Sequence, residues 1–442
     1  CFSPPTMSHF VRQSKYRHVF VEPPKVEETF QNLRLATTTG EQTYIKGNTK
    51  FFALALTGGG GPVGIFDLAK PGRMDPTTPV IAGHKGATLD FDFNPFHEHI
   101  IATASDDTTL KVWGIPEGGL SETITDPLVD LRGHGRKVTL CKFHPTASNV
   151  LASLGGDHLV KVWDIEKGSE INCYGGHTDL IQDISWDYTG QRYATSSKDK
   201  KVRIIDARSA EEAAIIEGAH EGAKSVKLCF LGSKDKMVSF GFTKQSQRQL
   251  RVWDSRNTAA ALSTTQIDQA AGVIMPFYDN DSNILYAAGK GDGNIRYYEC
   301  VDAKPFVFPL SEYRSTVACK GMTFLPKRAC NVMKCETAVA LKLTGNAVEP
   351  LKFIVPRKSD AFQEDLYPPT FSGIPSHTAD EWMGERVFRP RTPSCPRPKD
   401  LGVVSSRGGM IVRMRWGSGS PSSFEAGPYP PPPLRHPSSP PS

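Results

Sequence analysis

The sequence repeats a short pattern at an almost constant interval. In four stretches an Asp stands six positions before an aromatic or apolar residue: Asp107 and Trp113, Asp157 and Trp163, Asp199 and Ile205, and Asp292 and Tyr298. The residues that close the repeats stand at positions 113, 163, 205, 253 and 298, which gives steps of 50, 42, 48 and 45. Steps of this size are typical of stacked four-stranded units of roughly 40 to 45 residues. The pattern therefore predicts an all-β chain built from repeated blades.

A Gly-His pair precedes three of these stretches. The intervals from His84, His134 and His177 to the closing residue are 29, 29 and 28 positions. In a WD-type blade such a histidine, a central Ser or Thr, the turn Asp and the Trp indole form a chain of hydrogen bonds that satisfies each buried polar group. The predicted structural network consists of His84, Asp107, Trp113, His134, Ser153, Asp157, Trp163, His177, Asp199, His220, Trp253 and Asp292.

Two blades depart from this pattern. Ile205 cannot supply an indole donor, and Gln247 occupies the position of the turn Asp. These two blades are expected to depend on packing. In the blades that keep the pattern, the histidines and aspartates are predicted to be structural and not catalytic.

The chain can be divided into seven blades and two further segments. The last blade lacks both the Gly-His pair and the closing Trp-Asp, and the segment from Lys15 to Val21 is expected to supply its missing strand. A ring closed by both chain ends leaves no free strand edge. We therefore predict a seven-bladed WD-repeat β-propeller with a C-terminal extension packed on it. The expected divisions are a leader remnant (1–7), the propeller (8–350), the extension (351–390) and a disordered tail rich in Pro, Ser and Arg (391–442).

Composition excludes several classes of protein. No segment approaches the roughly 18 apolar residues that a membrane span requires, and the first thirty positions lack the apolar stretch of a secretory signal. The chain has nine cysteines, an odd number, and they are scattered, so reduced thiols and a cytoplasmic location are expected. Cys330 and Cys335 are spaced too widely for a zinc knuckle, and no second pair follows. No metal and no other cofactor is expected.

The net charge of +5 belongs to one end of the chain. Residues 391–442 contain seven Lys or Arg and two acidic residues, which leaves 45 basic and 45 acidic residues before them. A partner that is attracted by charge to the folded part must therefore bind a local charged patch. No nucleic-acid recognition motif accompanies the basic tail, so nucleic acid is not expected as a partner.

Several motifs outside the repeat pattern resemble the coronins. They are VRQSKYRHVF (11–20), GKGDGNIRYYE (289–299), LPKRACNVMKCE (325–336), VPRKSD (355–360) and FQEDLYPPT (362–370). The resemblance implies a seven-bladed propeller with a packed extension that binds actin filaments (F-actin) and regulates filament branching and disassembly. It also implies a location at the actin cytoskeleton and cell cortex.

The sequence departs from the coronin pattern after about Trp382, where no heptad of a coiled coil follows. In the family that coil drives oligomerisation, so a monomer is expected here. Cofilin and the branching actin nucleator are the other partners that the resemblance implies. The missing coil weakens the expectation of a contact with the nucleator.

Two sets of basic residues are candidates for filament contact. In the coronins a basic residue after the first strand is associated with this contact, and Arg34 in FQNLRL matches its motif position. A second candidate is a cluster on a blade turn and the following strand, made of Lys198, Lys200, Lys201 and Arg203. Actin filaments are acidic, so such a patch could add attraction and association rate. The alternative for both sets is ordinary solvated surface charge.

Other motifs carry less functional information. The glycines of Gly59 to Gly64 match the dinucleotide pattern only formally, because Pro62 interrupts it and a strand follows, so a hairpin turn is expected. His97 and His99 lack the H-E-x-x-H helix and are expected in a loop.

Two functional classes therefore remain open, an actin-binding scaffold and a general WD platform for a non-actin partner, for example a peptide over the central channel. No nucleophile elbow, phosphate loop or paired carboxylate motif suggests an enzyme.

Overall fold

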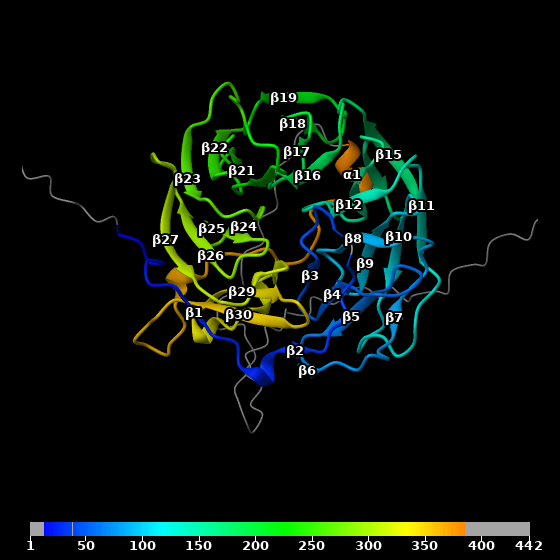
Figure 1. The fold of residues 1–442 in the computed structure, drawn as a ribbon, viewed down its shortest axis with the longest axis horizontal. Helices are drawn as coiled ribbons and strands as arrows, with labels where there is room; N and C mark the ends of the chain where they lie inside the picture. The colour runs from blue at the N-terminus through cyan, green and yellow to red at the C-terminus, as the bar shows by residue number, and fades with distance from the viewer. Residues whose placement is uncertain (1–12, 38, 385–442) are drawn as a thin grey trace, which may run out of the picture. The chain divides into compact units, whose positions relative to one another are not determined.

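Seven sheets surround a central axis in the computed structural model, which describes residues 13–37 and 39–384 (Figure 1). The seven-bladed propeller that the repeat pattern predicts is confirmed. The expected leader remnant (1–7), the tail (391–442) and positions 385–390 of the extension lie outside the described residues.

Six blades contain four antiparallel strands each. Blade 1 contains β3 (Ile45–Gly47), β4 (Phe51–Ala55), β5 (Val63–Asp67) and β7 (Val80–Ile81). Blade 2 contains β8 (Thr88–Phe93), β9 (Ile100–Ser105), β10 (Thr109–Gly114) and β11 (Val129–Arg132). Blade 3 contains β12 (Val138–Phe143), β13 (Val150–Gly155), β14 (Val160–Asp164) and β15 (Ser169–Tyr174). Blade 4 contains β16 (Ile181–Trp186), β17 (Arg192–Ser197), β18 (Lys201–Asp206) and β19 (Glu212–Glu217). Blade 5 contains β20 (Lys227–Phe230), β21 (Lys236–Phe242), β22 (Arg248–Asp254) and β23 (Ser263–Asp268). Blade 6 contains β24 (Ile274–Asp279), β25 (Ile284–Gly289), β26 (Ile295–Cys300) and β27 (Val307–Tyr313).

The seventh blade combines both ends of the described chain. Its consecutive strands are β28 (Gly321–Phe324), β29 (Glu336–Leu343) and β30 (Val348–Ile354), and β30 passes the expected propeller boundary at residue 350. The strands β1 (Phe20–Glu22), β2 (Phe30–Gln31) and β6 (Gly72–Arg73) join the same sheet. Short 3-10 helices occur at η1 (Val26–Glu28), η2 (Lys327–Ala329), η3 (Val332–Lys334) and η4 (Glu364–Leu366).

The N-terminal segment closes the ring, as the sequence predicts, but its strand is β1, and Lys15 to His18 of the expected strand form a turn. β1 pairs antiparallel with β30, and Val21 stands opposite Phe353. Tyr16 and Val19 are buried in one apolar cluster with Tyr297, whose hydroxyl donates to the Val19 carbonyl at 2.9 Å. The pairing leaves less of β30 as an open edge.

Neighbouring blades share their apolar cores. β13 is buried along its whole length, because both of its faces are covered by other blades. Trp163 of blade 3 belongs to a cluster that also contains Ala102 and Leu131 of blade 2. Each blade therefore needs its neighbour to bury its apolar face, which is the physical basis of repeat architectures.

Carboxylates on the inner strands also join adjacent blades. Asp90 accepts a hydrogen bond from the Cys141 amide at 3.0 Å, and Asp92 accepts one from the Phe143 amide at 3.0 Å. In the same way, Asp183 of blade 4 accepts a hydrogen bond from the Leu228 amide of blade 5 at 2.8 Å. These acidic residues satisfy first-strand amides that no strand partner reaches.

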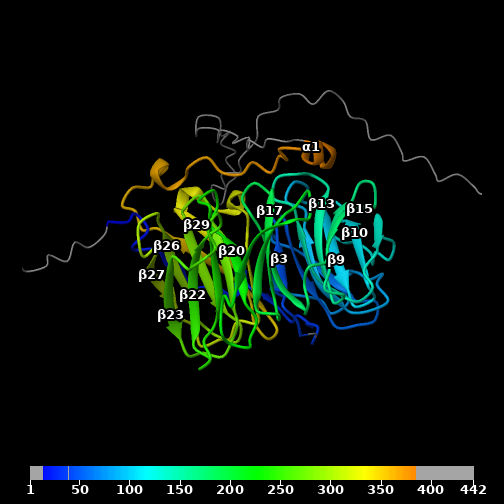
Figure 2. The ribbon, with the colours of Figure 1, turned by 90° about the horizontal axis from the view of Figure 1, so that it is seen from above.

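The C-terminal extension crosses one face of the propeller (Figure 2). Its last described element is the short helix α1 (Ala379–Gly384), whose Trp382 is buried with its ring 4.8 Å from that of His144. The Ser148 amide donates to the His377 carbonyl at 2.8 Å. The extension is therefore tied to blade 3, far from the point where β30 ends in the ring.

Candidate functional site

The hydrogen-bonded network is complete in blades 2 and 3. In blade 3, Nε2 of His134 and Nε1 of Trp163 meet the hydroxyl of Ser153 at 2.7 and 2.8 Å. Nδ1 of His134 meets Asp157 at 3.1 Å. In blade 2, Nε2 of His84 and Nε1 of Trp113 meet the hydroxyl of Thr103 at 2.7 and 2.8 Å. Nδ1 of His84 meets Asp107 at 3.0 Å.

Blade 4 replaces the missing indole with an arginine. Nη1 of Arg203 donates to Asp199 at 2.8 Å and lies 3.1 Å from Nδ1 of His177. Nε2 of His177 meets Thr195 at 3.1 Å. Arg203 is only 4% exposed, so its assignment to an exposed basic cluster is wrong. From the sequence, this blade is expected to depend on packing for lack of an indole, but Arg203 restores a polar network there.

Arginine also enters the network between blades 5 and 6. His220 and Trp253 both bond the Ser239 hydroxyl at 2.8 Å, although no Asp stands in the turn at Gln247. Asp292 meets no histidine of the described residues and instead accepts from the buried Arg248 of blade 5 at 2.6 Å. Arg248 also donates to Asp268 of its own blade. The network therefore links these two blades.

The turn aspartates define one face of the propeller. In each blade the turn between the second and third strands opens on the same side, and we name this side the turn face. Asp107, Asp157 and Asp199 each accept an amide hydrogen bond from the residue two positions later, at 3.0, 3.3 and 2.9 Å. The residue between adopts a positive φ, which is 67° at Lys200. This turn geometry holds Lys200 exposed at the edge of the sheet.

Arg34 also lies at the turn face. Its carbonyl accepts from the Thr57 amide at 3.0 Å, and Thr57 begins the turn between β4 and β5 of blade 1. The side chain of Arg34 is exposed, and no carboxylate of the described residues lies within ion-pair distance of it. Within the described residues Arg34 thus has no ion-pair partner, and its backbone is fixed by a hydrogen bond from Thr57.

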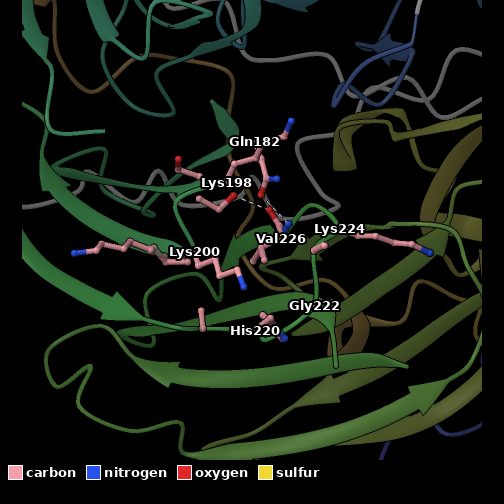
Figure 3. A pocket seen from close by; sticks show the side chains of 13 residues that line it. Gln182, Lys198, Lys200, His220, Gly222, Lys224 and Val226 are labelled. Atoms are coloured by element: carbon pink, nitrogen blue, oxygen red, sulfur yellow. Dashed lines mark hydrogen bonds between the residues drawn. The ribbon is translucent and has the colours of Figure 1, made fainter. Parts of the chain in front are cut away.

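A hollow on the same face gathers lysines from blades 4 and 5 (Figure 3). Lys198, Lys200, Lys201 and Lys224 line it together with His220. Lys201 pairs with Glu217 at 2.8 Å, and Lys224 donates to the Ala271 carbonyl at 2.7 Å. In the part of the chain that the structure describes, Lys198 and Lys200 form no ion pair. Sequence reasoning missed Lys224, although its position shortly after the blade-5 histidine could have indicated this face.

The segment after Arg34 is anchored across the axis by lysines of three blades. Lys227 pairs with Glu41 at 3.1 Å, Lys290 donates to the Gly40 carbonyl at 3.1 Å, and Lys320 donates to the Ala36 carbonyl at 3.1 Å. Burial, and then the charge of Lys227, lower the pKa of Lys290 to about 8. The anchoring gives the base of this segment, including Arg34, a fixed position.

The remaining motifs have structural positions. The segment from Gly59 to Gly64 forms part of the turn between β4 and β5 and the first two residues of β5, and no helix follows it. His97 and His99 lie in the loop between β8 and β9. The cysteines of the described residues are free thiols, and no group of metal-binding side chains occurs within those residues. Over the same residues, no helix is long and apolar enough to cross a membrane.

The fold and its networks define a WD-repeat β-propeller protein, and comparison with known proteins narrows the class. Profiles described as "WD domain, G-beta repeat" match residues 77–114, 125–164 and 168–206. One described as "Type of WD40 repeat" matches 348–385, and a domain of unknown function, DUF1899, matches 9–73.

A relative and two solved structures complete the comparison. Coronin-A of Dictyostelium discoideum is 45% identical over 389 residues, which are 88% of this chain and 86% of the relative. The WD40 domain of Toxoplasma gondii coronin superposes with a TM-score of 0.81 at 32% identity and covers 86% of this chain and 98% of that domain. A chain of a mitotic checkpoint complex shares the fold alone, with a TM-score of 0.56 at 14% identity over 81% of this chain and 100% of that chain. The chain belongs to the coronin family.

Proposed function

We propose that this chain binds the side of actin filaments through its turn face and regulates filament organisation and turnover. The observation that carries the proposal is the exposed, unpaired Arg34 on the same face as Lys198 and Lys200. Membership in the coronin family supports an actin-associated WD-repeat protein. A location at the cytoplasmic actin cortex belongs to the same proposal.

The physical argument is electrostatic. Positive side chains that keep no internal carboxylate partner attract an acidic filament surface and raise the association rate. Lys201 contributes less, since it already pairs with Glu217, and the buried Arg203 is left out of the proposed surface. The proposed contact residues are therefore Arg34, Lys198 and Lys200.

Cofilin and the branching actin nucleator are partners proposed from family membership alone. In the family the contact with the nucleator depends on a coiled coil. Among residues 13–37 and 39–384 the only α-helix is α1, which spans Ala379–Gly384 and is too short for such a coil.

Filament cosedimentation tests the proposal directly. The full chain should pellet with filaments at micromolar actin, and Arg34→Ala and the double change Lys198→Ala with Lys200→Ala should each weaken pelleting. Lys358→Ala is the matched control, because Lys358 is also exposed but lies on the extension. Normal pelleting of both turn-face variants, or pelleting of wild type only at low salt, would contradict binding through this face.

A further inference from the structure

A cavity of about 600 Å³ opens at the end of the central channel that the extension crosses. Its walls include the last residues of the inner strands β12, β16, β20, β24 and β28, so five blades contribute to it. The extension supplies the outer rim through Pro369 to Ser376. This volume falls in the range of sites that hold a ligand or a peptide side chain.

The cavity is apolar and aromatic, and its rim exposes large apolar side chains. Phe143, Trp186, Phe230, Phe277 and Tyr278 line it. On the rim, Tyr188, Phe371 and Ile374 are 37%, 42% and 65% exposed. Exposed apolar side chains that gather around one opening often mark an interaction site, whereas single scattered ones do not.

One carboxylate on the wall, that of Asp281, forms no ion pair with any of the described residues. Asp279 pairs with Lys327 at 2.5 Å, and Asp187 pairs with Arg192 at 3.4 Å. Asp281 is half-buried, and no Lys or Arg of the described residues lies within ion-pair distance of it. Burial, and then the charge of Asp279, raise the pKa of Asp281 against the opposing effects of a hydrogen bond from Thr370 and the charge of Lys327. A cation that entered the cavity would relieve this unfavourable position, and the nearby ring faces would also favour it.

The extension shows which kind of molecule this surface accommodates. It lays extended backbone across the mouth, with the Ser376 amide donating to the Thr146 carbonyl at 2.8 Å and Phe371 stacking edge-on against Phe96 at 5.8 Å. A second extended segment could lie beside it and insert a side chain into the channel.

We propose that this cavity binds a short peptide segment of another protein, in which a large apolar side chain enters the aromatic channel and a neighbouring Arg or Lys meets Asp281. This site lies at the opposite end of the channel from the turn face, so it does not depend on the proposed actin contact. Its failure and the failure of actin binding would be seen in separate experiments.

Fluorescence anisotropy on the full chain tests the proposal with a labelled peptide of sequence GRFLRG. Wild type should bind it, and should bind the charge-reversed peptide GEFLEG at least about fivefold more weakly. Asp281→Asn should weaken binding of GRFLRG by about fivefold as well. Glu122→Gln, which removes an exposed carboxylate of blade 2, should bind like wild type.

A second variant tests the apolar part of the site. Ile374→Ala shortens an exposed rim side chain, so it should fold normally and bind GRFLRG more weakly. Equal binding of both peptides, equal binding by Asp281→Asn, or no binding by wild type at millimolar peptide would overturn the proposal. Cross-links that place residues 385–442 of the same chain in the cavity would overturn it too.

Discussion

At the scale of single residues, Arg203 shows how one side chain can replace another in a buried network. An indole donates one hydrogen bond to a central hydroxyl, whereas the guanidinium of Arg203 reaches the turn Asp199 and the ring of His177 directly. The position that looked like part of a surface patch therefore stabilises the blade.

Replacing Arg203 should cost far more stability than replacing its exposed neighbour Lys198. Arg203→Ala leaves the nearly buried carboxylate of Asp199 without its partner, which typically costs about 3–5 kcal/mol. Lys198→Ala should change the free energy of unfolding by less than about 0.5 kcal/mol. Urea unfolding followed by tryptophan fluorescence measures both, and similar midpoints for the two variants would contradict the structural role.

Buried histidines should make the fold sensitive to moderate acid. Burial is the main cause that lowers the pKa of His144 and His220 to about 3 and that of His177 to about 4, from an ordinary 6.5. The unfolded chain therefore binds more protons below pH 6.5. The stabilisation by neutral rings is complete above that pH and is lost as the pH falls toward the folded values.

The melting temperature should thus fall as the pH is lowered from about 6.5 to 4. Aspartates such as Asp107 add little in this window: burial alone would raise its pKa, but hydrogen bonds from Thr109 and Lys85 lower it to about 2. Calorimetry across this range should show a shallower fall for His177→Asn, while the exposed-site variant His18→Gln should follow wild type. Parallel curves for wild type and His177→Asn would exclude this explanation.

At the scale of elements, helix α1 acts as the distal anchor of the extension. Trp382 is 1% exposed and packs against His144, and its carbonyl accepts from Arg208 at 3.3 Å. The extension between β30 and this anchor contributes few strand pairings to the ring. Leu366 and Tyr367 hold its first part against the apolar cluster of blades 6 and 7, so the Trp382 contact and the backbone bonds near His377 anchor its distal part.

Trp382→Ala should release the extension without unfolding the blades. Loss of a buried Trp typically costs about 3–5 kcal/mol. Here the loss destabilises the docking of the extension and not the folding of the blades. Limited proteolysis should then cut within residues 368–378 much faster than in wild type. Met383→Ala, at a 40% exposed neighbour, is the control and should leave the cleavage rate unchanged. An unchanged cleavage rate in Trp382→Ala would show that other contacts hold the extension.

At the scale of the whole propeller, the sequence predicts the number of blades better than it predicts the side-chain contacts between blades. Turn aspartates and closing residues stand at fixed spacing in four of the repeats, so the repeat and its closure could be predicted. Arg248 and Asp292 belong to different blades, and no local spacing relates them. The cavity under the extension was equally hidden, because its walls come from five separate strands.

Removing the N-terminal strand tests whether ring closure limits stability and oligomeric state. A chain beginning at Pro24 loses β1 and the buried side chains of Tyr16 and Val19, which should cost about 3–6 kcal/mol. It also leaves backbone groups of β30 unpaired between Lys352 and Ile354, and such an edge favours pairing with a second copy. Size-exclusion chromatography with light scattering should give a monomer for a chain beginning at Gln13 and larger species for the shorter chain. A shorter chain that stays monomeric and melts at the same temperature would mean that β2 and the consecutive strands close the ring without β1.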